Sequence, residues 1–220
     1  MSEYLIQGET LTGIADAIRG KTGGTAPVAV SDMAAQIEGI QAGGGGDDVL
    51  YALLDRSITE ISSRVTSIGA YAFRQCNKMT KVDFPAATTI GTYAFTDCHE
   101  LTKAVFPAVT KVDSYAFRYN SGLKMVDFPA ATTIGGHAFD SCSALTEVIL
   151  RSDTMVVISN TAVFNGTPIK TGTGYIYVPS ALIEQYKVAD NWPTYATQFR
   201  ALEDYTVDGT TTGELDPNKI

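Results

Sequence analysis

The most regular feature of the sequence is an apolar pattern that returns every 22 residues between residues 65 and 153. One part of it is a block ending in Ala-Phe, whose four copies occupy residues 68–73, 90–95, 112–117 and 134–139. The other part has apolar residues at its first, fourth and sixth positions and occupies residues 79–85, 101–107, 123–129 and 145–151. We expect one short strand and one turn-rich return per unit, stacked because no unit can bury its apolar edge alone.

A stack of this kind needs a cap at each end. Residues 49–64 contain a short alternating apolar pattern and are predicted to form the N-terminal cap. At the other end, residues 158–164 are predicted to be a degenerate fifth return, because Phe164 follows Phe139 by 25 residues rather than 22.

The chain after this fifth return loses the repeat. Residues 174–179 have the composition of a strand, and residues 180–187 that of a short helix. With the aromatic residues Trp192, Tyr195 and Phe199 they form the predicted C-terminal cap, so that the repeat domain with its caps spans residues 49–205.

The two ends of the chain differ from the repeats. Residues 1–42 carry two stretches with helical apolar spacing, and residues 43–48 form a glycine-rich linker. Two short helices bury too little apolar surface to be stable alone, so they are expected to pack on another copy, on another protein or on the repeat domain. Residues 206–220 are polar and acidic, which predicts a disordered tail or an arm that orders against a partner. The attachment or oligomerisation residues proposed for the N-terminal unit are Leu11, Ile14, Ile18, Met33 and Ile37.

Three sequence blocks resemble segments of known protein families. Residues 88–107 contain Ile-Gly-x-Tyr-Ala-Phe, a cysteine three residues later and Leu-Thr-x-Ala-x-Phe-Pro, and they resemble the BspA-type leucine-rich repeat. Residues 11–23 with residues 31–34 resemble a short module at the start of tail-associated and other virion proteins of phages that infect Firmicutes. The block from Tyr175 to Tyr195 is similar to the end segment of such repeat domains in gut bacterial and phage proteins.

These resemblances imply a fold and a function. The expected fold is an α+β solenoid, a leucine-rich repeat stack of short parallel strands with turn or 3-10 returns, a small N-terminal helical unit and an α/β C-terminal cap. The expected function is that of a non-enzymatic phage virion protein, tail-associated or decorating the particle, that binds a host-surface glycan or protein. Other virion proteins and further copies of the chain, held through the N-terminal unit, are the remaining expected partners. The alternative is a bacterial cell-surface adhesin. Such adhesins usually carry a signal peptide, and the first residues here lack its basic and apolar regions, so we favour the virion.

The charge and hydropathy of the chain exclude several partners. A net charge of -8 gives no basic footprint for nucleic acid. No run of about 18 apolar residues exists, so we expect no membrane insertion. Neither a phosphate-binding loop nor a zinc-type ligand spacing occurs, and we expect no cofactor and no metal.

Two residue pairs deserve a test as catalytic groups. Cys98 and His99 are adjacent, but cysteine recurs with the repeat, which favours a packed, reduced thiol over a nucleophile. Asp83 and Asp127 occupy the same strand position two units apart and could be a general acid and base of a glycan hydrolase. A solvated mixed-charge surface explains these aspartates better. His137, which replaces the repeated tyrosine, is expected to pack or to form hydrogen bonds.

What remains for binding is the surface that varies between units. The third and fifth strand positions should point away from the core and form a continuous sheet face. The return loops add a second set of variable residues. The strand-face candidates are Lys81, Asp83, Lys103, Val105, Met125, Asp127, Glu147 and Ile149, and the loop candidates are Arg74, Gln75, Asp97, His99, Arg118 and Tyr119.

Overall fold

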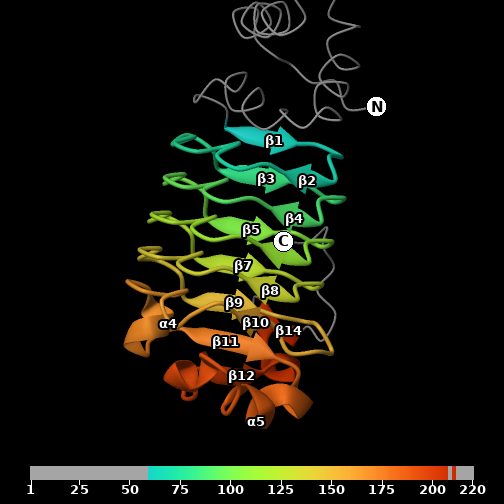
Figure 1. Ribbon diagram of the computed structural model, residues 1–220, viewed down its shortest axis with the longest axis vertical. Coiled ribbons are helices and arrows are strands. Elements are labelled where there is room, and N and C mark those ends of the chain that lie inside the picture. Colours follow the sequence, from blue (N-terminus) through green and yellow to red (C-terminus); the bar gives the residue numbers. More distant parts are fainter. Residues whose placement is uncertain (1–58, 208–209, 212–220) are drawn as a thin grey trace, which may run out of the picture.

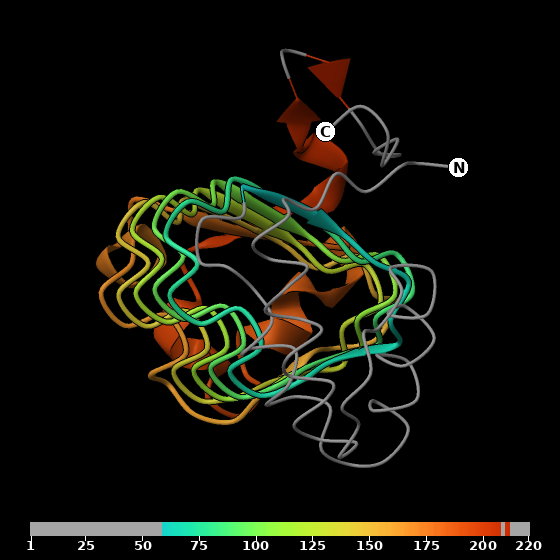
Figure 2. The same cartoon turned by 90° about the horizontal axis from the view of Figure 1, so that it is seen from above.

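A computed structural model describes residues 59–207 and 210–211 of the chain. Within these residues the chain winds into a stack of coils whose longest direction is vertical in Figure 1. Seen from above in Figure 2, successive coils lie over one another, with one sheet on each of two sides of the cross-section. The predicted repeat stack of short parallel strands is therefore confirmed.

The larger sheet is built from the predicted repeat strands. Backbone ladders pair β1 with β3, and join β5, β7, β9, β11 and β12 in that order, and every pairing is parallel. In register, Lys103 lies beside Met125, Met125 beside Glu147 and Glu147 beside Tyr175. The outward surface of this sheet is called the strand face below. Its strands are β1 (Glu60–Ser62), β3 (Lys81–Asp83), β5 (Lys103–Val105), β7 (Met125–Asp127), β9 (Glu147–Ile149), β11 (Tyr175–Val178) and β12 (Phe199–Ala201).

A second parallel sheet runs along the returns, which the sequence did not predict. Each of its strands has two residues, too few to leave an alternating pattern. The returns of the repeats contain turns, one of the two expected forms. They are not 3-10 helices, because φ is positive at Tyr71 (61°) and Gln75 (63°) and at their equivalents in later coils, which breaks a right-handed helix. The strands are β2 (Ser67–Ile68), β4 (Thr89–Ile90), β6 (Lys111–Val112), β8 (Thr133–Ile134) and β10 (Val157–Ile158).

Columns of phenylalanine fill the interior between the two sheets. Phe73 and Phe95 stack with ring centroids 5.0 Å apart, and the same contact continues down the stack. Phe164 extends this column, since its ring lies 5.6 Å from Phe139 at an interplanar angle of 7°. The fifth return is thus present, and the additional residues lie between β9 and Phe164. Burial of one large aromatic side chain per coil provides the main stabilisation of the stack.

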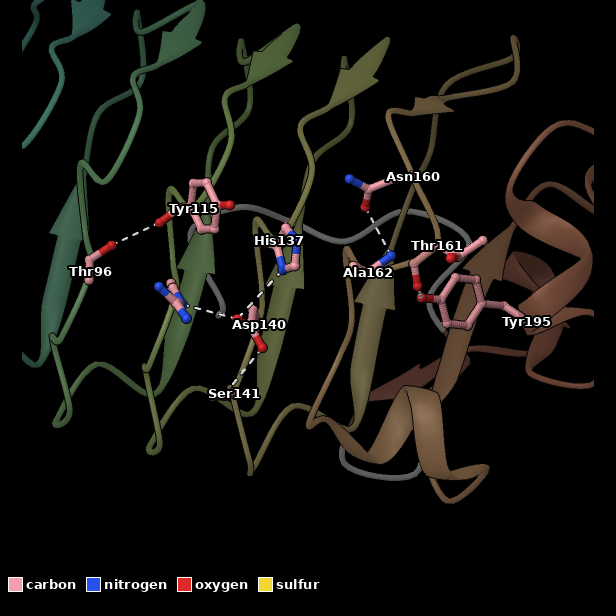
Figure 3. Close-up of polar contacts among 10 residues, drawn as sticks. Thr96, Tyr115, His137, Asp140, Ser141, Asn160, Thr161, Ala162 and Tyr195 are labelled. Atoms are coloured by element: carbon pink, nitrogen blue, oxygen red, sulfur yellow. Dashed lines mark hydrogen bonds and ion pairs between the residues drawn. The ribbon is translucent and has the colours of Figure 1, made fainter.

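The chain from residue 168 to residue 201, called the closing segment, follows the last coil. Its polar side chains bond to that coil's backbone: the Tyr186 hydroxyl accepts from Val156 N at 2.8 Å, and Trp192 Nε1 donates to Val156 O at 2.8 Å. The Tyr195 hydroxyl donates to Thr161 O at 2.6 Å (Figure 3). Val156 O is equivalent to Thr132 O, which accepts from Val157 N of the following coil, so Trp192 replaces the donor that a further coil would supply. Its helical elements, which include the short helix expected after β11, are α4 (Pro168–Thr171), η1 (Ser180–Leu182), α5 (Ile183–Tyr186) and η2 (Trp192–Tyr195).

The end of the described chain leaves the stack. After β12, η3 (Leu202–Asp204) turns the chain outward, and β13 (Thr206–Val207) then pairs antiparallel with β14 (Thr210–Thr211). No helix among the described residues is long and apolar enough to cross a membrane. The predicted N-terminal unit with Leu11, Ile14, Ile18, Met33 and Ile37, the linker, and residues 49–58 of the N-terminal cap lie outside the described residues.

Candidate binding surface

The strand face has an open half, formed by β1, β3 and β5. Lys81, Asp83 and Lys103 are exposed there, as predicted, and Val105 at its border is half-buried. Ser62 on β1 donates a hydrogen bond from its hydroxyl to Asp83 Oδ2 at 2.9 Å. This half therefore presents charged and hydroxyl groups to solvent.

The other half of the strand face is covered. The C-terminal arm, defined as residues 202–205, packs Leu202 and Tyr205 over β7 and β9 and buries Met125 and Ile149. Figure 2 shows the C-terminal strands standing outside the sheet that contains β1. The expectation of a continuous open face is wrong at Met125, Asp127 and Ile149, because the chain turns back across the sheet after β12.

Tyr205 anchors this arm. Its hydroxyl donates to Glu147 Oε2 at 2.9 Å, and its ring meets Tyr177 edge-on with centroids 4.6 Å apart. Burial, followed by the hydrogen bond to Glu147, raises the pKa of Tyr205, so the hydroxyl keeps its proton and remains a donor. Glu147, a predicted binding residue, is half-buried and already engaged by the arm.

Asp127 lies beneath this cover and is 2% exposed. Arg151 holds it in a two-pronged contact, with Nε donating at 3.0 Å to Oδ1 and Nη2 donating at 3.0 Å to Oδ2. Burial raises the pKa of Asp127, although the hydrogen bond and charge of Arg151 act in the opposite direction. Since Asp83 is exposed and Asp127 is enclosed, the two carboxylates do not share a solvent-filled cleft, and the geometry gives no support to an acid and base pair.

The loop candidates lie along a separate edge of the stack. The Arg118 guanidinium lies 4.3 Å from the ring centroid of Tyr119, which is 40% exposed, and its Nε donates to Asp140 Oδ2 at 3.0 Å. His99 is exposed, with Nδ1 3.4 Å from the Ser121 hydroxyl. The remaining predicted residues, all half-buried, are Arg74, Gln75 and Asp97.

A column of aromatic rings lies at the surface beside these loops, which the sequence did not predict. Tyr71, Tyr93, Tyr115 and His137 stack with centroids 5.1, 4.8 and 5.0 Å apart, and each ring is partly exposed. Their identical spacing in the sequence indicated packing alone. His137 does pack on Tyr115, and its Nδ1 lies 3.6 Å from Asp140 Oδ2 (Figure 3), as expected of a packing residue. The left-handed backbone at these positions was the feature that turned the rings outward.

The suspected nucleophile is enclosed in the core. Cys98 is buried with its thiol donating to Phe73 O at 3.1 Å, and burial raises the pKa of this thiol, which disfavours the reactive thiolate. The adjacent His99 is exposed instead of facing it. In the described part of the chain, no group of three or more His, Cys, Asp or Glu side chains could hold a metal ion.

The chain is similar to two solved structures. One is a leucine-rich repeat protein of T. pallidum, with 22% sequence identity and a TM-score of 0.48, over 56% of this chain and 59% of that chain. The other is the pneumococcal vaccine antigen PcpA, with 13% identity and a TM-score of 0.42, over 68% of this chain and 42% of that chain. The chain thus spans less than two thirds of either protein. No curated protein matches it in sequence.

A family model extends the repeats beyond the four regular copies. The BspA type leucine-rich repeat region matches residues 49–170 in six copies, which is more than half of the chain. Leucine-rich repeat domains are generally binding modules that mediate protein or surface interactions. The protein belongs to the family of BspA-type leucine-rich repeat proteins.

Proposed function

We propose that this protein is a non-enzymatic recognition protein whose repeat body binds a glycan or protein on a host cell surface. The observation that carries the proposal is the open half of the strand face, where Lys81, Asp83 and Lys103 are exposed on adjacent strands. On β7 and β9 of that sheet, Tyr205 and Leu202 cover Met125 and Ile149. A ligand of the strand face therefore meets β1, β3 and β5.

The proposed location is a phage particle, on its tail or as a surface decoration. The resemblance of residues 11–23 and 31–34 to a virion module supports this location. The N-terminal unit, with Leu11, Ile14 and Ile18, would attach the body to other virion proteins or to further copies of the chain. Several copies on one particle would make weak single contacts sufficient for attachment. A cell-surface adhesin, supported by the family membership, is the alternative.

The closing segment has the proposed role of the C-terminal cap. Without it, the backbone groups of Val156 and Thr161 and the face of Phe164 that contacts Trp192 and Tyr195 would meet water at the end of the stack. The bonds from Trp192, Tyr186 and Tyr195 support this role. A stack without such an end would pair with other chains at its open edge.

The experiment uses the full chain, labelled and incubated with cell walls of candidate host bacteria. We expect binding that a Lys81→Ala/Asp83→Ala variant reduces and that a matched Lys111→Ala/Asp113→Ala variant, on the second sheet, leaves unchanged. Equal binding by both variants would move the site away from the strand face. Absence of binding to any cell wall would contradict recognition itself.

The location has a separate test. Antibody labelling in the electron microscope should find the protein on purified particles, and a Leu11→Asp/Ile14→Asp variant should be lost from them while still binding cell walls. Labelling of bacterial cells in place of particles would favour the adhesin.

A further inference from the structure

We infer that the open half of the strand face binds an anionic glycan, a polysaccharide that carries sulfate, phosphate or carboxylate groups, through Lys81, Lys103 and Lys124. This inference rests on the proposed function and names the chemical class of its ligand.

Two lysines without an ion-pair partner among the described residues occur here, together with the exposed carboxylates of Asp83 and of Glu60, which lies beside Lys81 in register. Lys81 and Lys103 occupy the same repeat position on β3 and β5, which follow each other in the stack. Lys124 is exposed one residue before Met125, which lies beside Lys103 in register. None of the three forms an ion pair with a described residue. By contrast, carboxylates neutralise three lysines elsewhere on the surface, in the pairs Lys78–Glu100, Lys111–Asp113 and Lys187–Glu184.

The strand ladder is interrupted where the two lysines meet. Within the described residues β1 pairs with β3 and β5 pairs with β7, but no ladder joins β3 to β5, although β5 follows β3 in the stack (Figure 1). Like charges on directly adjacent strand positions repel each other and weaken pairing. A bound anion between Lys81 and Lys103 would remove that repulsion.

The acidic character of the whole chain does not oppose this assignment. Residues 59–205 contain 12 Lys and Arg and 13 Asp and Glu, so the repeat body is close to neutral. The remaining residues, 1–58 and 206–220, contain 4 basic and 11 acidic residues and account for most of the net charge of -8. An anionic polymer therefore meets a nearly neutral body that presents Lys81 and Lys103 on successive strands.

The chemistry of the surrounding residues favours a glycan over an acidic protein. Protein interfaces are centred on buried aromatic or apolar anchors. The large apolar side chains exposed among the described residues are Tyr71, Tyr119, Met155, Val157 and Val188, and none lies on β1, β3 or β5. The exposed neighbours of the lysines are polar, namely Ser62, Thr80 and Thr102 with hydroxyl groups and Glu60 and Asp83 with carboxylates, and both kinds of group can bond to sugar hydroxyls.

The test measures binding of the full chain to four polymers of one length and one backbone: dextran, dextran sulfate, dextran phosphate and carboxymethyl dextran. We expect binding to at least one charged polymer and none to dextran, and the order of the three identifies the anion. A Lys81→Ala/Lys103→Ala variant should bind roughly tenfold more weakly, with the slope of log affinity against log salt reduced by about 2. The control Lys111→Ala/Lys187→Ala, with the same change in net charge, should match the wild type, and thermal unfolding should confirm that both variants fold.

Three outcomes would overturn the inference: equal binding to dextran and to its charged forms, equal losses in the two double variants, or tighter binding to polyglutamate than to any charged dextran. If cell walls are bound while any of these holds, the proposed function stands and the ligand is of another class. If no cell wall is bound at all, the proposed function fails, whatever the dextrans show.

Discussion

Asp83 and Asp127 occupy the same position of the repeat, on β3 and β7, yet they have opposite environments. Asp83 is exposed and accepts a hydrogen bond from Ser62. Asp127 is almost completely enclosed and is held by Arg151 under the arm that Tyr205 anchors. Both side chains point away from the core because they share one repeat position. The C-terminal arm, which is distant in sequence, covers Asp127 and leaves Asp83 exposed to water. One half of the strand face is consequently part of the fold, and the other half is available to a ligand.

The charged side chains of the two halves also differ in whether they have partners. In the covered half, Arg151 neutralises Asp127, and the hydroxyl of Tyr205 donates a hydrogen bond to Glu147. Both of these carboxylates therefore have partners. In the open half, Lys81 and Lys103 form no ion pair with a described residue, although Glu60 lies beside Lys81 in register. Desolvation explains the difference, because an unpaired charge is costly only when water is excluded.

The largest effect should come from breaking the buried ion pair. Arg151→Ala leaves the Asp127 carboxylate enclosed and unpaired, and we expect the free energy of unfolding to fall by about 3–5 kcal/mol. Lys81→Ala, in the open half, should change it by less than about 0.5 kcal/mol. Urea titration of both variants measures the contrast, and similar losses would contradict it.

Removal of the arm's anchor should have the next largest effect. Tyr205→Ala exposes Met125 and Ile149 and should cost about 2–4 kcal/mol, while Tyr205→Phe removes the bond to Glu147 alone and should cost about 1 kcal/mol. Tyr119→Ala, at an exposed tyrosine, serves as the control. Hydrogen exchange should accelerate at β7 and β9 but not at β3 in Tyr205→Ala. Uniform acceleration of exchange over the sheet would mean that the arm stabilises the whole stack and not only the covered half.

A smaller effect should appear in the pH dependence of stability. Because burial raises the pKa of Asp127 above its ordinary value of 3.8, the folded state binds this proton more tightly than the unfolded state does. The group therefore favours folding most below about pH 4, and this contribution is lost as pH rises through the folded pKa. We expect the unfolding free energy of the wild type, minus that of Asp127→Asn, to decrease from pH 3.5 towards neutrality in urea titrations. An increase would show that the charge of Arg151 outweighs burial.

The smallest effect should be a gain in the open half. Lys103→Glu replaces the repulsion between Lys103 and Lys81 by attraction and should stabilise the protein by about 0.2–1 kcal/mol. The same substitution at Lys111 loses an exposed pair with Asp113 and should give no gain. Thermal melting at low salt compares the two. A loss of stability in Lys103→Glu would indicate that the lysines do not repel each other.

Local spacing made much of the fold predictable. Apolar residues at the first, fourth and sixth positions identified β3, β5, β7 and β9, and Phe164 identified the fifth coil in spite of its shifted spacing. The second sheet was not predicted, because strands of two residues are too short to show an alternating pattern. The exposed tyrosine column was not predicted, because its invariance along the repeats indicated packing in the core. The backbone at Tyr71 and its equivalents is left-handed, which the repeat pattern does not reveal.

The binding surface was predictable only in part for a related reason. The sequence by itself determined the stack, since each contact between coils joins residues about one repeat apart and recurs in every unit, as in the bonds from Thr110 to Thr88 and from Thr132 to Thr110. Tyr205 and Glu147 are 58 residues apart, and their contact occurs once. No periodic pattern encodes such a contact, so only the tertiary structure decided that Met125, Asp127 and Ile149 would be covered and that Lys81, Asp83 and Lys103 would remain open.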